Sequence, residues 1–229
     1  NQHPVLGCLA LLGCIAVYAL LGALIHVRNL PSIVVTLGMS FIWMGGAVLL
    51  LPAPGGTAPQ WLQGLVRIKT PVLPFAIFVC VALAIGVHLF LMRSTLGVVL
   101  RGAGGNPLAI AKAGWSLLRI KLTMYALAGT FGVFSGLFLV GLTTSADASI
   151  ALRYTLLSIA GVILGGGEFV GGRVSPTGAV LGALTLVLAG SLLSFMRISP
   201  DWQIGAQGAI LILVLALRTS VNRLEARPL

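Results

Sequence analysis

Acidic side chains are nearly missing from this sequence. Its 229 residues include four aspartates and glutamates, and 8% of the residues are charged, whereas soluble domains carry about 25%. The four acids are Asp147, Glu168, Asp201 and Glu225, and none of them lies in the middle of a long apolar run. So few charges cannot cover a water-exposed surface. With 58% hydrophobic residues and a mean hydropathy of +1.09, the composition predicts a protein of the lipid bilayer.

Residue types used in catalysis and metal binding are also scarce. The three cysteines lie inside apolar runs without a CxxC pair, and the three histidines are scattered one to a segment, which favours neither a metal site nor a disulfide framework. The sequence contains no HExxH motif, no GxSxG motif and no paired carboxylates. We therefore expect no catalytic residue, no metal and no cofactor in this chain.

Among acids and histidines, only His88 lies near the interior of an apolar run. Proton-coupled pumps and cation transporters usually place acids or histidines inside the membrane. If this chain transports a solute, we expect the solute to be uncharged, or the energy for transport to enter elsewhere.

Basic residues, in contrast, give the chain a net charge of +10. The 14 lysines and arginines fall almost entirely in short gaps between apolar runs, as they do in cytoplasmic loops of membrane proteins. There is no basic stripe with interleaved aromatic residues, so nucleic acid is not expected as a partner.

Seven apolar runs are candidates for membrane spans, each of which needs about 20 residues. The fifth and seventh are short, as broken or buried helices are. The runs cover residues 5–27, 32–51, 72–92, 120–142, 154–164, 177–196 and 204–217.

The charge bias predicts how these runs are oriented. The segment 93–121 carries five basic residues and no acid, and the tail after residue 217 carries three arginines against Glu225. Both are expected in the cytoplasm. The fourth to seventh runs lie between them, and an even number of crossings returns the chain to the same side. This topology places Arg28 and Arg173 inside. It places Asp147, Arg197, Asp201 and the loop 52–71 outside.

Glycine clusters in two patterns. "GGGEFVGGR" at residues 165–173 suggests a phosphate-binding loop, but that motif requires GxxxxGK[ST], and here Arg173 and Val174 follow the glycines. Three GxxxG pairs favour close helix packing in a polytopic bundle: Gly132–Gly136, Gly161–Gly165 and Gly178–Gly182.

The basic segment 93–121 also has an internal pattern. Asn106 and Pro107 precede "LAIAKAG", and proline suits the first turn of a helix. We expect a short cytoplasmic helix that docks a soluble partner or, alternatively, a solvated loop.

Three stretches resemble one family when taken in order. They are "PSIVVTLGMSFIWMGGAVLLL", "LGVVLRGAGGNPLAIAKAGWSLLRIK" and "LSIAGVILGGGEFVGGRVSPTGAVLGALTL". Together they resemble the permease subunits of ribose-type bacterial ABC importers. The resemblance covers nearly the whole chain.

The resemblance implies a partner set and a docking segment. Family members have about ten spans, so three would precede the seven found here. Two permeases, identical or related, would form the channel, a cytoplasmic ATPase would hold ATP and Mg²⁺, and a periplasmic protein would deliver the solute. The residues expected to contact the ATPase are Arg101, Gly105, Asn106, Pro107, Leu108, Ala109, Ala111, Lys112 and Gly114.

Polar residues on the second run offer a candidate solute path. Ser32, Thr36, Ser40 and Trp43 recur at helical spacing and share one face. They line a polar path or, in the simpler interpretation, take part in interhelical packing and hydrogen bonding.

The sequence thus predicts an all-α polytopic bundle with residues 1–229 as one transmembrane permease domain. It would be multi-pass in the bacterial inner membrane, with a cytoplasmic C-terminus. Its function would be alternating-access import of a sugar or similar small neutral solute, with no enzymatic activity of its own. The alternatives are an ATP-independent channel or secondary transporter, a membrane scaffold, or an importer permease for nucleosides or branched-chain amino acids.

Overall fold

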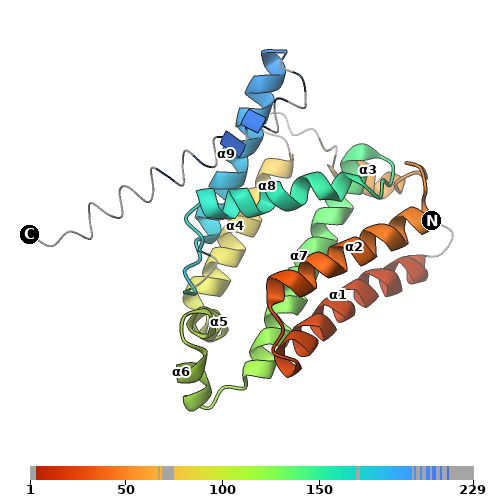
Figure 1. Cartoon of the computed structure of the whole chain (residues 1–229). Helices are drawn as coiled ribbons and strands as arrows, with labels where there is room; N and C mark the ends of the chain where they lie inside the picture. The colour runs from red at the N-terminus through yellow and green to blue at the C-terminus, as the bar shows by residue number, and fades with distance from the viewer. Residues whose placement is uncertain are drawn as a thin grey trace, which may run out of the picture. The chain divides into compact units, whose positions relative to one another are not determined.

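The computed structural model describes residues 4–66, 75–168 and 171–197, with isolated positions at 68, 199 and between 202 and 216. In this part of the chain every regular element is a helix (Figure 1), and strand pairing is limited to one isolated bridge between Gly55 and Ala146. The helices are α1 (Pro4–Val27), α2 (Ser32–Leu50), α3 (Gln60–Val66), α4 (Phe75–Arg93), α5 (Thr95–Gly105), α6 (Pro107–Lys112), α7 (Leu117–Thr143), α8 (Ile150–Leu164) and α9 (Pro176–Phe195).

Four of the described helices are long and apolar enough to cross a membrane: α1, α2, α7 and α9. Helices α4 and α5 meet the same criterion as a pair bent by 75°. Helices α1, α2, α7 and α9 correspond to the first, second, fourth and sixth predicted runs, and the bent pair begins with the third run. The fifth run is α8, which has 15 residues. Eight of the fourteen residues of the seventh run lie outside the described residues, as do Arg67, Lys69, Asp201 and the basic tail. The all-α polytopic class is confirmed for the described residues.

The surface of the described helices is apolar. Helix α2 has no buried residue, and leucines at its end are almost fully exposed, Leu49 at 87% and Leu50 at 88%. A soluble protein does not expose contiguous apolar surface of this extent. In a bilayer the same side chains meet lipid tails, which is the environment that the composition predicts.

The chain divides into two compact units, which are described separately. The first comprises residues 1–81 and 102–151, and the second comprises residues 82–101 and 152–229. The expectation of one permease domain over residues 1–229 stays a prediction.

In the first unit, α1 packs along α7 through two matched contacts. Tyr125 of α7 lies on Gly22 of α1, where an added Cβ would come within 2.9 Å of the tyrosine ring. Tyr18 of α1 lies on Gly129 of α7 in the same way, at 2.9 Å from the tyrosine Cβ. Each helix therefore supplies one tyrosine and, four residues later, one glycine. Because the higher-numbered residue of one helix meets the lower-numbered residue of the other, the two helices are antiparallel.

The antiparallel arrangement decides which loops share an end. Arg28, just after α1, lies at the end of the pair where α7 begins with Arg119 and Lys121. At the other end, the loop after α2 pairs with the loop after α7. Gly55 and Ala146 exchange two backbone hydrogen bonds of 3.0 Å, and Ala58 N–H donates to the Thr144 carbonyl at 2.9 Å. Both pairings agree with the sides that the basic residues predict.

Helix α3 was not expected in the loop 52–71. It lies beside the end of α7 (Figure 1), where Leu62 and Val66 meet Gly141. An added Cβ on Gly141 would stand 2.8 Å from a Val66 methyl group and 3.3 Å from Leu62 Cγ. The loop therefore contains a helical turn that packs on a span.

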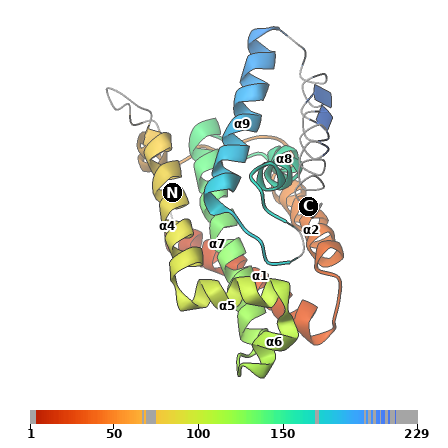
Figure 2. The ribbon, with the colours of Figure 1, turned by 90° about the vertical axis from the view of Figure 1, so that its left-hand side faces the viewer.

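In the second unit, α8 and α9 cross at glycines (Figure 2). Gly165 meets the backbone of Gly178, and Gly182 meets the backbone of Gly161. The GxxxG interpretation is thus confirmed for Gly161–Gly165 and Gly178–Gly182. A Cβ on Gly132 or Gly136 would meet nothing within 4 Å in the described chain, so close packing at this pair stays a prediction.

The α1–α7 contact predicts a matched pair of variants. Gly129→Leu forces a large side chain against Tyr18, and overpacking of this kind costs about 1–3 kcal/mol. We expect the thermal midpoint in detergent to fall by several degrees. Gly132→Leu, one turn away on an open face of the same helix, should have a thermal midpoint within about a degree of the wild-type value. Equal midpoints for the two variants would contradict the contact.

Candidate functional site

The basic segment 93–121 contains two helices and begins at a sharp bend. Helix α5 leaves α4 at 75°, and Ser94 at the corner serves both helices. Its hydroxyl donates to the Phe90 carbonyl at 2.5 Å and accepts from Gly97 N–H at 3.0 Å, so it terminates α4 and caps α5.

Gly97 permits this bend because it lacks a side chain. A Cβ at this position would collide with the carbonyl oxygens of Phe90 and Leu91 in the last turn of α4. Helix α5 was not predicted from the sequence. Ser94 at a capping position before an apolar face was the signal, since Val99 and Leu100 are buried while Thr95 and Arg93 are exposed.

Helix α6 follows at once and is capped at both ends. Asn106 Oδ1 accepts from Ala109 N–H at 3.1 Å, and Pro107 occupies the first turn. At the other end Gly114 has φ +87°, and Trp115 N–H reaches back to the Ile110 carbonyl at 3.2 Å. This is a glycine-terminated helix end of the usual kind. The short helix expected from "LAIAKAG" is confirmed.

Helix α6 is held against its neighbours by few contacts. A Cβ on Gly102 in α5 would stand 2.8 Å from Ile110 Cδ1, so α5 and α6 lie close at that point. Ser116 caps the start of α7 at 3.5 Å from Arg119 N, and α6 contacts α7. Because α6 contacts its neighbours on one side, its other side chains are exposed.

Eight of the nine residues expected to contact an ATPase are exposed. Leu108 is the most prominent apolar one, at 73% exposure. Arg101 differs, because it is half-buried and its Nε has no hydrogen-bond partner in the described structure. The exposed residues are Gly105, Asn106, Pro107, Leu108, Ala109, Ala111, Lys112 and Gly114. They form a small apolar and basic surface, and their contact with another protein stays a prediction.

Two of the four candidate path residues on α2 are turned back onto their own helix. Thr36 Oγ1 donates to the Ser32 carbonyl at 2.9 Å, and Ser40 Oγ donates to the Leu37 carbonyl at 2.7 Å. The Ser32 hydroxyl hydrogen-bonds Tyr125 of α7, and Trp43 is 38% exposed. These contacts favour the packing interpretation, and a solute path along α2 stays a prediction.

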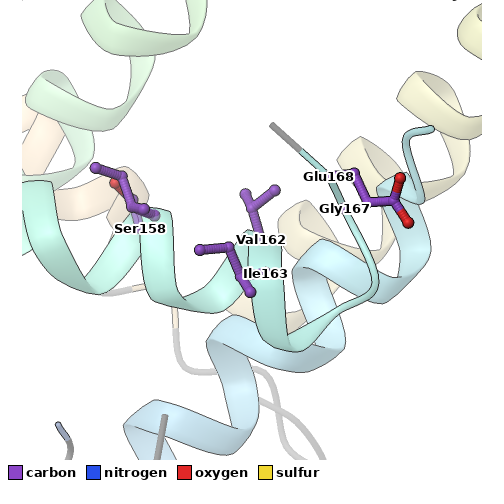
Figure 3. Close-up of a pocket in the computed structure, with 6 residues that line it drawn as sticks. Ser158, Val162, Ile163, Gly167 and Glu168 are labelled. Carbon is purple, nitrogen blue, oxygen red and sulfur yellow. The ribbon is translucent and has the colours of Figure 1, made fainter. Parts of the chain in front are cut away.

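The glycine-rich turn between α8 and α9 has its own architecture. Gly166, Gly171 and Gly172 have positive φ angles. Glu168 N–H donates to the Arg173 carbonyl at 3.1 Å, and the two side chains form an ion pair of 3.7 Å. A shallow pocket beside the turn is lined by Ser158, Ile159, Val162, Ile163, Gly167 and Glu168. Figure 3 shows the Glu168 carboxylate pointing away from Val162 and Ile163. The turn joins two tightly crossed helices and places a carboxylate, which repels phosphate, among its glycines.

The family model that matches residues 3–215 is described as branched-chain amino acid transport system / permease component. The chain belongs to this family. It is accordingly a multi-pass membrane protein related to permeases rather than to enzymes. No solved structure matches the chain.

Individual relatives include sugar permeases. The chain is 27% identical over 204 residues to the galactose/methyl galactoside import permease protein of Haemophilus influenzae, covering 86% of this chain and 61% of the relative. It is 29% identical to a probable ABC transporter permease protein of Sinorhizobium fredii, with 88% and 62% covered. It is 25% identical to the ribose import permease protein of Escherichia coli, with 86% and 63% covered. The chain therefore spans about three fifths of these relatives' length, and the resemblance found in the sequence is confirmed.

The bend at Ser94 can be tested by the distance between two spin labels, one on α4 and one on α5. Spin labels at Leu83 and Gly104 would be about 32 Å apart along a straight helix, at about 1.5 Å per residue, and closer across the 75° bend. We expect Gly97→Val, in a background without cysteines, to lengthen the distance toward the straight value. Gly86→Val, whose position is open, should not change it. An unchanged distance in Gly97→Val would show that Gly97 does not determine the bend.

Proposed function

We propose that this chain forms part of the membrane permease of an ATP-driven importer for a monosaccharide or similar small neutral solute. Three observations support the proposal. The family is one of transport permeases, several relatives are named as sugar import permeases, and the apolar runs contain almost no ionisable group that a proton-driven carrier would use.

In this proposal ATP is hydrolysed on a separate cytoplasmic subunit. That subunit holds ATP and Mg²⁺, and this chain binds no cofactor. A second permease, identical or related, completes the channel, and a periplasmic binding protein delivers the solute. The chain lies in the bacterial inner membrane with its C-terminus in the cytoplasm. Lipid surrounds it, and nucleic acid has no part.

The geometry of helix α6 is the main structural support for the proposal. It is short, capped at both ends and exposed on the side away from α7. Its surface combines Leu108 with one basic residue, Lys112, and no acid, which suits a partner with an apolar and acidic groove. We infer that the ATPase docks here.

A mechanical route leads from α6 into the membrane. Helix α6 contacts α7, and α7 is fixed to α1 by the two tyrosine–glycine contacts. A displacement of α6 by the ATPase would therefore move α7 and α1 together as a packed pair. Such rigid-body motion of one group of helices is the usual basis of alternating access.

Branched-chain amino acids are the alternative solute, because the family description names them. Zwitterionic solutes need hydrogen-bond donors and acceptors in the path but no intramembrane charge. The same uptake assay separates the two solute classes.

A charge placed on α6 tests the proposal. We expect the double variant Ala109→Asp, Ala111→Asp to lose the co-purifying ATPase and to reduce ATP-driven monosaccharide uptake into proteoliposomes at least about tenfold, which corresponds to about 1.4 kcal/mol. The reason is that an interface without counter-charges must desolvate both carboxylates. Ala109→Ser with Ala111→Ser, which adds polar but uncharged groups at the same exposed positions, is the matched control and should behave as wild type.

Three results would contradict the proposal. Uptake without ATP would indicate a channel or secondary transporter. Uptake of leucine but of no monosaccharide would indicate the amino-acid alternative. Undiminished ATPase binding in the α6 variant would place the docking surface elsewhere.

A further inference from the structure

Helix α3 carries more apolar surface than α7 covers. In a helix, successive residues are about 100° apart, so Leu62 and Val66 fall on one side, where Leu62 is 7% exposed. Trp61 and Leu65 fall on the adjoining side, and they are 63% and 41% exposed. The apolar side chains of α3 therefore extend beyond its contact with α7.

The remaining side of α3 carries two glutamines and a glycine. Gln60, Gln63 and Gly64 occupy the side away from the apolar arc, and Gln63 Nε2 donates to the Ala58 carbonyl at 2.8 Å. Gly64 has nothing within 4 Å of its Cβ position. The helix thus has three sides: one on α7, one apolar and uncovered, and one polar.

The place of α3 along α7 fixes its depth. It packs at Gly141, and α7 ends two residues later at Thr143. Helix α2 ends at Leu50, and the chain reaches α3 through a loop whose backbone is hydrogen-bonded to residues 144–146. Since α2 and α7 are both candidate spans, α3 lies where two spans leave the bilayer.

Exposed apolar side chains of two candidate spans occur at the same end of the first unit as the uncovered side of α3. Leu142, next to the contact with α3, is 60% exposed, and Leu49 and Leu50 at the end of α2 are 87% and 88% exposed. Ile68, just after α3, is 45% exposed. Tryptophan is enriched at the membrane–water interface, and an amphipathic helix with one apolar side and one polar side suits that depth.

We propose that α3 is an interfacial helix that lies in the membrane surface, with Trp61 and Leu65 inserted among the lipids and Gln60, Gln63 and Gly64 facing water. It anchors the loop pair formed by residues 51–59 and 144–149 to the bilayer at that end of α7. The inference depends on the membrane-spanning character of the family and is independent of which solute the protein carries.

Depth-dependent fluorescence quenching tests this. A variant that retains Trp61 and has Trp43, Trp115 and Trp202 replaced by phenylalanine is reconstituted into phosphatidylcholine vesicles. The lipids carry bromine either near the headgroup or near the acyl-chain ends. We expect Trp61 to be quenched at least about twofold more by the shallow bromines than by the deep ones, and only weakly by aqueous acrylamide. A variant that retains only Trp43, within α2, provides a reference in a spanning helix.

A second probe separates the two exposed sides of the same helix. In a background with all four tryptophans replaced by phenylalanine, Gly64→Trp should respond to acrylamide and not to brominated lipid. Two results would overturn the proposal. Strong acrylamide quenching of Trp61 without lipid quenching would place that side in water, free to bind a protein. An equal response of the two probes would show that the lipid contact does not follow the helix face.

Discussion

Tyr18 and Tyr125, each lying on a glycine of the opposite helix, hold α1 and α7 together, and the organisation of the first unit depends on this contact. In lipid the hydrophobic effect does not bring helices together, because the tails are as apolar as leucine, and close van der Waals packing replaces it. Glycine allows the backbones to approach, and the tyrosine ring supplies the contact area. A pair of such contacts in opposite order also fixes the direction in which the helices run.

The direction of these helices decides what each end of the unit contains. The end with Arg28 and the start of α7 also carries α6, because α7 begins at Leu117, three residues after Gly114 at the end of α6. The other end holds the hydrogen-bonded loops and α3. Basic residues concentrate at the first end, and Asp147 lies at the second. There its carboxylate accepts from Ser149 N–H at 2.8 Å and from Ser149 Oγ at 2.7 Å, and the backbone hydrogen bond lowers the pKa of Asp147 most. The polar chemistry of the two ends therefore differs, and the apolar helices separate them.

Hydropathy predicted the described spans because it is a property of whole segments, which one sequence displays directly. The sides that the charges predict agree with the pairing of the loops and stay a prediction. Asn106, Pro107 and Gly114 likewise revealed α6, since capping is local. Helices α3 and α5 were missed. The stretch "WLQGLV" is too short for a span-length window, and α5 was hidden by its glycines, although Ser94 was a usable signal. The glycine contacts were only partly predictable, because Gly132–Gly136 and Gly161–Gly165 share a motif while only the second meets a partner helix in the described chain. The YxxxG spacing shared by Tyr18–Gly22 and Tyr125–Gly129 was visible in the sequence, but its meaning depends on the pairing of segments about 100 residues apart.

The central claim, that α1 and α7 cross the membrane as an antiparallel pair, is tested most directly by the accessibility of single cysteines. Cys8, Cys14 and Cys80 are replaced by alanine, and one cysteine is introduced at Asn29, Ser116, Thr57 or Ser149, all exposed. A membrane-impermeant maleimide is then applied to intact spheroplasts. The account predicts labelling at 57 and 149, and protection at 29 and 116 until the membrane is opened. Labelling of 29 and 149 from the same side would contradict it.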